Sequence, residues 1–196
     1  VHFVGNTMID TLVAFDPAIQ ASQVLSELGL SEGDSFLLMT MHRPATVDHA
    51  SGCQFILDLL GKLVHRMPVV FPMHPRTRKN FERLGWLAQL NHPNIILTPP
   101  LDYFAFQKLI ASAQAIITDS GGIQEESTFR KVQCVTLRPN TERPSTLDLG
   151  TNRLIPSFDV EAVLDALDRP KQGIVPPLWD GRATERIIDV LLELKN

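Results

Sequence analysis

Cysteine is scarce in this sequence, and long apolar runs are missing from it. The chain has only two cysteines, Cys53 and Cys134, and each lies in an apolar stretch. Two such thiols do not form the bridged framework of a small secreted domain, so we expect them to be buried and unbridged in a reducing cytoplasm. No run approaches the roughly 18 apolar residues of a membrane-spanning helix, and no basic segment followed by an apolar one indicates a signal peptide.

A surplus of positive charge is also absent. Lysine and arginine total 18 against 22 acidic residues, which gives a net charge of −4. This balance disfavours a nucleic-acid-binding or membrane-surface protein. The 196 residues, 44% hydrophobic and 20% charged, are typical of a globular chain, and we expect one domain over residues 1–196. Because the chain begins at Val1 instead of methionine, we expect its start to be a cut in a longer sequence.

Several catalytic signatures are missing. There is no GxxxxGK[ST] sequence, which disfavours a P-loop ATPase, and no G-x-S-x-G elbow, which disfavours a serine hydrolase. The histidines are widely spaced and neither cysteine lies near one in a ligand pattern, so a zinc site is disfavoured too.

Short apolar runs alternate with segments of helical periodicity. Continuous apolar runs of this length are typical of strands buried on both faces, and the alternation predicts a Rossmann-like α/β fold, a parallel sheet with helices on both faces. The expected strands are 36–41, 69–73, 95–98, 115–118 and 132–137, and the clearest helical periods are 55–63, 106–113, 160–167 and 187–192. Residues 6–12 and 22–28 give weaker helical patterns, joined through Pro17.

Polar residues gather where these strands end. Ligands of open α/β sheets bind beyond the carboxyl ends of the strands. His42-Arg43, His74 and the run Asp119–Gly122 each follow a predicted strand, and Arg138 and Arg143 follow the fifth. We expect these groups to converge on one rim, although a lone histidine after a strand is more often structural.

Asp119-Ser120-Gly121-Gly122 is the sharpest motif, since it lies between an apolar strand and a helix. Paired glycines allow positive φ and close approach of a ligand, and the helix start offers unpaired N–H groups that suit a phosphate. The alternative is an ordinary strand-to-helix turn that requires glycine. Glu125 and Glu126 are expected in the first turn of the helix, either to complement its dipole or to accept hydrogen bonds from a ribose.

Taken in order, these motifs resemble the non-hydrolysing UDP-N-acetylglucosamine 2-epimerases over nearly the whole chain. Two positions depart from the family pattern: Ala45-Thr46 replaces a usual Glu-Asn pair, and Ser145 replaces a common glutamate. The two departures affect the expected details of the site and the choice of substrate, but not the expected fold. The matching segments are Gly5-Asn6-Thr7, Met41–Pro44, Met73–Arg76, Thr118–Glu126, Thr141–Pro144, Gly150–Asn152 and Trp179-Asp180-Gly181.

The resemblance implies the carboxyl-terminal half of a two-domain, glycosyltransferase-B-type architecture with its active site in the cleft. Residues 1–30 would lie near the interdomain junction, and the amino-terminal domain would be absent. The family converts UDP-GlcNAc to UDP-ManNAc by elimination and re-addition of UDP, without a metal or nicotinamide cofactor. The resemblance also implies that the full-length protein is a cytoplasmic homodimer that serves cell-surface polysaccharide synthesis.

Roles follow only for residues that match the family motifs. His42 would assist departure and return of UDP, Phe106 would pack on uracil, and Glu126 would bind the ribose hydroxyls. Phe106 also fits an ordinary core position of its helix. The residues that would hold the phosphates are Ser120, Gly121, Gly122 and Arg143. Arg43 and His74 are weaker substrate-binding assignments, and His74 could belong instead to a second, regulatory UDP-GlcNAc site that some bacterial members have near this cleft.

Three other functional classes stay open at this stage. A UDP-sugar-dependent glycosyltransferase shares the architecture, but it requires an acceptor site. A hydrolysing relative would release free ManNAc and UDP. A UDP-sugar-binding module without chemistry of its own is the third, because the carboxylates that would move the C2 proton are expected in the other domain.

Overall fold

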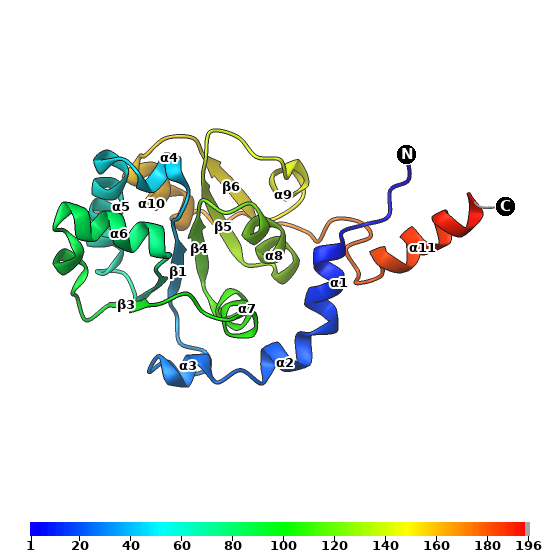
Figure 1. Cartoon of the computed structure of the whole chain (residues 1–196), viewed down its shortest axis with the longest axis horizontal. Helices are drawn as coiled ribbons and strands as arrows, with labels where there is room; N and C mark the ends of the chain where they lie inside the picture. The colour runs from blue at the N-terminus through cyan, green and yellow to red at the C-terminus, as the bar shows by residue number, and fades with distance from the viewer. Residues whose placement is uncertain (195–196) are drawn as a thin grey trace.

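A six-stranded parallel sheet forms the centre of the molecule in the computed structural model, which describes residues 1–194 (Figure 1). The strand order is β3-β2-β1-β4-β5-β6, that of a doubly wound dinucleotide-binding fold, and every neighbouring pair is parallel. The strands are β1 (Leu37–Thr40), β2 (Val69–Pro72), β3 (Ile95–Thr98), β4 (Ala115–Thr118), β5 (Gln133–Leu137) and β6 (Asn152–Ile155).

Helices cover both faces of the sheet, which confirms the Rossmann-like prediction. In order they are α1 (Thr7–Ala14), α2 (Asp16–Gln20), α3 (Val24–Glu27), α4 (Pro44–Val47), α5 (Ala50–Leu63), α6 (Pro75–Leu84), α7 (Tyr103–Ser112), α8 (Gly122–Arg130), α9 (Pro144–Asp148), α10 (Val160–Asp168) and α11 (Ala183–Glu193), with a 3₁₀ turn at Leu87–Leu90. None of the helices in this described part is long and apolar enough to cross a membrane.

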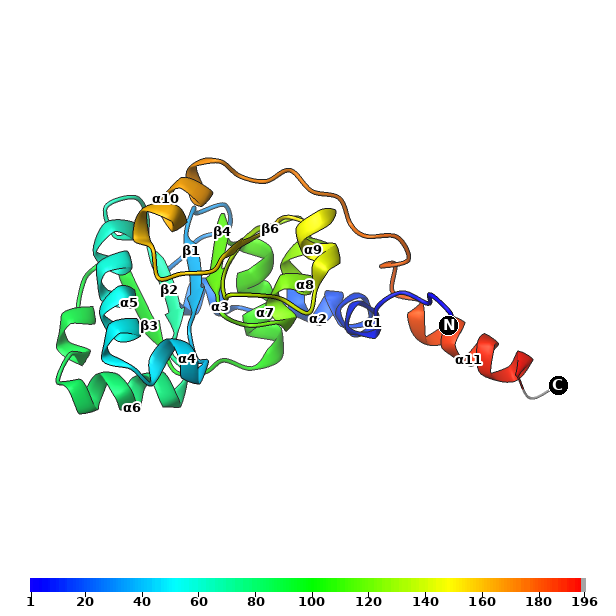
Figure 2. The same ribbon diagram turned by 90° about the horizontal axis from the view of Figure 1, so that it is seen from above.

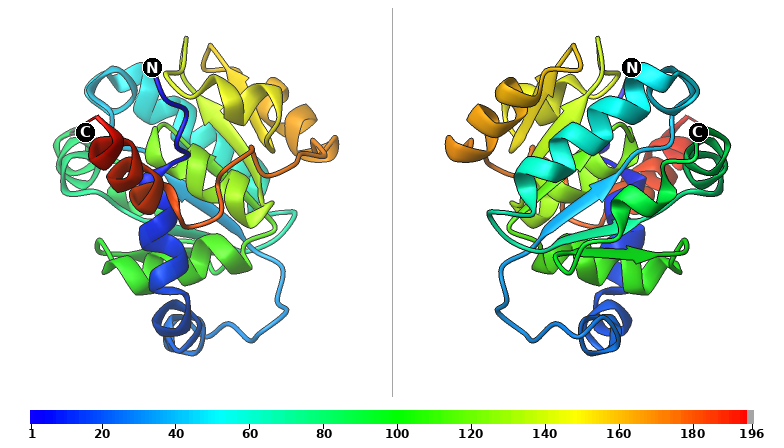
Figure 3. Two further views of the ribbon diagram at one scale, coloured as in Figure 1. Left: turned by 90° about the vertical axis from the view of Figure 1, so that its right-hand side faces the viewer. Right: turned by 90° about the vertical axis from the view of Figure 1, so that its left-hand side faces the viewer.

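Alternate residues of each strand enter two separate cores. Leu37 and Met39 of β1 join the core beneath α5, α6 and α10, whereas Leu38 joins the core beneath α3 and α7. Successive side chains of a strand point to opposite faces, so a continuous apolar run is what a sheet covered on both sides requires. Figure 3 shows the sheet between α5 (cyan) on one side and α7 (green) on the other.

All five predicted strands are present, and the sequence pattern missed the sixth. Strand β6 carries Asn152 and Arg153 and lies at the edge of the sheet, so only its first residue is buried. Helix α6 was missed for a similar reason, because only Thr77 and Phe81 of its residues are buried. At the amino terminus, Pro17 lies in the first turn of α2 and does not merely join two helices.

The two cysteines are buried and free, as predicted. Cys53 lies in α5 and Cys134 in β5, where each packs within the apolar interior. Burial raises the pKa of both thiols, that of Cys134 to about 11. A thiol with a raised pKa carries little thiolate and reacts slowly, so both side chains act as small apolar groups.

The first and last helices are tied together at one end of the molecule. The Asp10 carboxylate of α1 accepts hydrogen bonds from the backbone N–H groups of Ala183 (3.0 Å) and Thr184 (2.6 Å) at the start of α11. These N–H groups have no partner within their own helix, so Asp10 serves as its cap from a distant part of the sequence. Figure 2 shows α11 projecting beyond the sheet beside α1.

Replacing this cap tests the attachment of α11. We expect Asp10→Ala to lower the free energy of unfolding by about 1 kcal/mol, the usual contribution of a helix cap. Amide hydrogen exchange should accelerate in α11 and leave the strands unchanged. Asp189→Ala, at an exposed position of α11, is the matched control. Equal exchange in the two variants would contradict a capping role for Asp10.

Candidate functional site

The site lies where the strand order reverses, between β1 and β4. In open α/β sheets the loops that follow two such strands diverge and leave a crevice for a ligand. β1 ends at Thr40 and continues into His42 and Arg43, and β4 ends at Thr118 and continues into Asp119 and Ser120. The predicted convergence on one rim is therefore correct for these two loops.

Asp119 binds the two loops to each other. Its fully buried carboxylate accepts hydrogen bonds from the backbone N–H groups of His42 (3.0 Å) and Arg43 (2.8 Å), and lies 2.9 Å from Nδ1 of His42. Burial acts to raise the pKa of Asp119, but these hydrogen bonds outweigh it and the pKa lies below its ordinary value. The carboxylate thus stays ionised and fixes the imidazole through Nδ1, which leaves Nε2 as the ring's second polar atom.

A cavity of about 210 Å³ opens beside His42. Four of the predicted site residues line it together: His42, His74, Phe106 and Ser120. The two imidazole rings lie 5.5 Å apart between centroids. Phe106 also packs against the core beneath α7, so it is both a core residue and a wall of this cavity. Apolar walls with a few polar groups are typical of a small-molecule site.

The glycine pair opens the helix that follows β4. Helix α8 begins at Gly122 with Gly121 as its N-cap, and no side chain caps its first N–H groups. Neither glycine adopts the positive φ that a glycine pair allows, and Gly121 has φ −77°. A Cβ on Gly122 would lie 3.2 Å from Cε of Met8, whereas one on Gly121 would meet only two guanidinium groups near 4 Å. Gly122 therefore allows α1 to pack closely, and Gly121 leaves an open approach to the helix start.

The two glutamates of α8 differ in their surroundings. Glu125 lies in the first turn as predicted, and Glu126 lies one residue later. Burial raises the pKa of Glu125, although the nearby guanidinium of Arg143 and a hydrogen bond from Asn6 oppose this. Burial, together with the charge of Glu125, raises the pKa of Glu126 to about 7, despite a hydrogen bond with Gln107.

Arg143 lies apart from the cavity at His42. Its Nε is 2.9 Å from the Glu125 carboxylate, which also accepts a hydrogen bond from Asn6 (2.8 Å). Arg143 and Glu125 line a separate cavity of about 460 Å³ between the amino-terminal segment and the loop that leads to α9. The sequence placed Arg143 on the rim, but it gave no sign that a glutamate of α8 would be its partner.

Arg138 is a site residue to which the sequence gave no role. It follows β5, is 8% exposed, and forms two hydrogen bonds of 2.8 and 3.0 Å with the Glu142 carboxylate. These bonds lower the pKa of Glu142 to about 2. A Cβ on Gly121 would lie 3.8 Å from a guanidinium nitrogen of Arg138 and 4.0 Å from one of Arg43. Two positive groups therefore flank the start of α8.

The raised pKa of Glu126 makes stability depend on pH. Between the ordinary value of 4.5 and about 7, folded Glu126 keeps a proton that the unfolded chain has released. Its contribution to the free energy of unfolding is fully present below pH 4.5 and is lost as the pH rises through 7. We expect Glu126→Gln to flatten this decline, which for one buried carboxyl amounts to about 1–3 kcal/mol.

Chemical denaturation at several pH values measures this slope. Glu161→Gln, at an exposed position of α10, is the control and should leave the decline unchanged. An identical pH dependence in the parent chain and in Glu126→Gln would show that the proton is held elsewhere.

Comparison with known proteins adds an independent observation. The family model for UDP-N-acetylglucosamine 2-epimerase matches residues 1–192. A UDP-N-acetylglucosamine 2-epimerase of Methanococcus maripaludis is 31% identical, and the match covers all of this chain and 56% of that protein. A UDP-2,3-diacetamido-2,3-dideoxy-D-glucuronate 2-epimerase of Pseudomonas aeruginosa is also 31% identical, and the match covers 97% of this chain and 52% of that protein.

The fold is shared with a solved relative. The crystal structure of the Methanocaldococcus jannaschii UDP-GlcNAc 2-epimerase, in complex with UDP-GlcNAc and UDP, superimposes with a TM-score of 0.83 at 30% identity and covers 98% of this chain and 54% of that one. The chain spans about half the length of the curated relatives it matches. The family model covers residues 1–192, and the strand order with its rim between β1 and β4 agrees with it. The chain therefore belongs to the UDP-N-acetylglucosamine 2-epimerase family.

Proposed function

We propose that this chain is the nucleotide-binding half of an isomerase that interconverts UDP-GlcNAc and UDP-ManNAc by elimination and re-addition of UDP. The observation that carries the proposal is the cavity beside His42, where four residues predicted from the sequence come together at the switch point of the sheet. The family membership supports the same activity. An amino-terminal domain that closes the cleft, a homodimer of the full-length protein and a cytoplasmic location are parts of this proposal.

In the proposed complex, UDP extends from the cavity to the start of α8. Uracil lies against Phe106, whose ring lines the cavity, and Ser120 lies between the base and the phosphates. The N–H groups of the Gly121-Gly122 turn meet the phosphates, which the positive end of the helix dipole also favours. Glu126 accepts hydrogen bonds from the ribose hydroxyls. Arg143 exchanges part of its contact with Glu125 for a phosphate oxygen.

His42 is the proposed catalytic residue of this half. As the C1–O bond of the nucleotide sugar breaks, negative charge grows on the departing diphosphate, and a donor beside it lowers the barrier. Asp119 keeps the imidazole in place through Nδ1, so Nε2 is the atom that faces the phosphate. Arg43 supplies a second positive charge, and His74 lies close enough to shape the same cavity. The C2 proton is moved by carboxylates of the other domain.

The isolated chain tests nucleotide binding directly. We expect UDP to bind almost as well as UDP-GlcNAc, and free GlcNAc to cause no change in the NMR spectrum, because all the proposed contacts are with the nucleotide. In Gly121→Val the side chain occupies the approach to the helix start, and UDP affinity should fall by about tenfold or more. Gly61→Val, at an exposed glycine of α5 with open space around it, is the control. Unaltered UDP binding in Gly121→Val would contradict the phosphate site.

The full-length enzyme tests the role of His42. We expect His42→Ala to lower turnover by about 10²–10⁴, the usual contribution of a positioned acid, with a much smaller change in UDP affinity. His49→Ala, at an exposed histidine just before α5, should keep parental turnover. If His42→Ala turns over at the parental rate, the residue is structural. Product identity by NMR separates an epimerase from a sugar-transferring or hydrolysing enzyme.

A further inference from the structure

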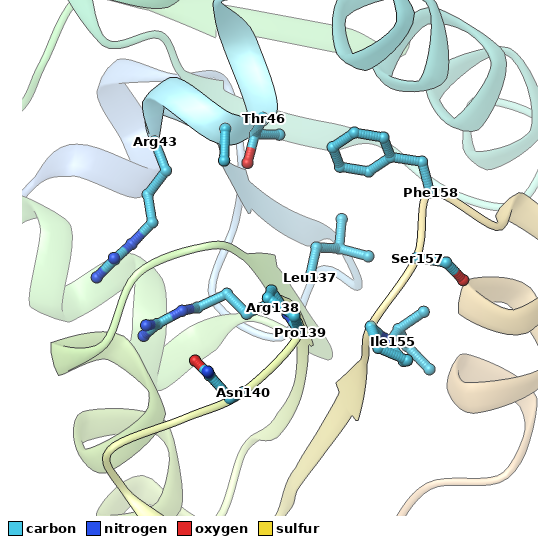
Figure 4. Close-up of a pocket in the computed structure, with 11 residues that line it drawn as sticks. Arg43, Thr46, Leu137, Arg138, Pro139, Asn140, Ile155, Ser157 and Phe158 are labelled. Carbon is cyan, nitrogen blue, oxygen red and sulfur yellow. The ribbon is translucent and has the colours of Figure 1, made fainter.

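A second cavity of about 270 Å³ lies at the carboxyl ends of β5 and β6 (Figure 4). It has no lining residue in common with the cavity beside His42. Arg43 forms part of its wall, and Ala45 and Thr46 of α4 form another part.

The cavity has two chemically different flanks. Leu137, Ile155 and Phe158 make one flank apolar, and the Phe158 ring is held in place by stacking on Phe55 at 5.2 Å. The guanidinium groups of Arg43 and Arg138 end together on the other flank (Figure 4). A ligand that fits both flanks carries an anionic group at one end and an apolar body at the other.

One arginine at this cavity has no carboxylate at ion-pair distance within residues 1–194, although the charge of Arg43 reaches Glu142. Arg138 forms its two hydrogen bonds with Glu142, which offsets its charge. The Nε of Arg43 is buried, and within residues 1–194 it has neither a hydrogen-bond acceptor nor a carboxylate at ion-pair distance. Because no carboxylate of the described residues pairs with Arg43, its guanidinium in the cavity wall is available to a carboxylate supplied by a ligand.

We propose that this cavity binds a small monocarboxylate with an apolar body, with its carboxylate on Arg43 and its body against Leu137, Ile155 and Phe158. A single guanidinium without an ion-pair partner matches one carboxylate, and charge-assisted bonds of this kind are strong. The volume lies just below the usual range for drug-sized ligands, so a molecule of about the size of benzoate fits.

This site communicates with the start of α8 through Arg43. The Arg43 guanidinium faces the cavity and also lies 4.0 Å from the Cβ position of Gly121. A carboxylate bound in the cavity and a phosphate bound at Gly121 therefore draw on the same positive charge. Each ligand weakens the binding of the other, and by the same factor, because coupling between two sites is reciprocal. This second step rests on the proposed function, whereas the binding of the monocarboxylate does not.

The probe is benzoate, and benzamide is its uncharged match. We expect benzoate to shift the NMR signals of Leu137, Ile155 and Phe158, and benzamide to bind about tenfold more weakly because it lacks the charge. Ala45→Leu fills the cavity from an exposed position and should abolish the shifts. Ala50→Leu, the same substitution at an exposed alanine of α5, should leave them intact.

Several outcomes would overturn the proposal. These are shifts confined to Ser120, Gly121 and Gly122, equal binding of benzamide, no shift with benzoate, or full binding in Ala45→Leu. In a second titration, saturating benzoate should weaken UDP binding severalfold in the parent chain but not in Ala45→Leu. If UDP fails to bind even without benzoate, the proposed function is wrong. The benzoate titration alone still tests whether the cavity binds a monocarboxylate. If UDP affinity is the same with and without benzoate, the coupling through Arg43 is wrong.

Discussion

The buried carboxylate of Asp119 is the interaction on which the site depends. The loops after β1 and β4 are 77 residues apart in sequence, and Asp119 joins them through two backbone N–H groups and the His42 ring. Without this acceptor, buried donors would lose their partner and the imidazole would lose its orientation. The same carboxylate thereby determines the shape of the crevice at the point where the sheet changes direction.

The positive groups around the start of α8 have unequal freedom. Arg138 and Arg143 each have an acidic partner, Glu142 and Glu125, whereas in the part of the chain that the structure describes no carboxylate lies at ion-pair distance from Arg43. An arginine held by a carboxylate keeps its geometry but offers a weaker net field to an incoming anion. The site therefore combines preformed geometry with one guanidinium available for a ligand.

Much of the fold was predictable because the central strands are buried on both faces and read as continuous apolar runs. The edge strand β6 and the exposed helix α6 lack this signal, and they were missed. Their positions after predicted strands indicated that His42, His74 and Ser120 would lie together, and all three line one cavity. The pairing of Arg143 with Glu125 depends on how α8 packs against the amino-terminal segment, which local sequence does not encode.

The close approach of Met8 to Gly122 restricts which side chains this chain accepts at position 122. A Cβ at position 122 would lie 3.2 Å from Cε of Met8, so a larger residue there requires the end of the Met8 side chain to shift. The two positions are 114 residues apart, yet they are expected to covary among relatives. Changes in α1 and at the first residue of α8 are thus coupled through the Met8 methyl group.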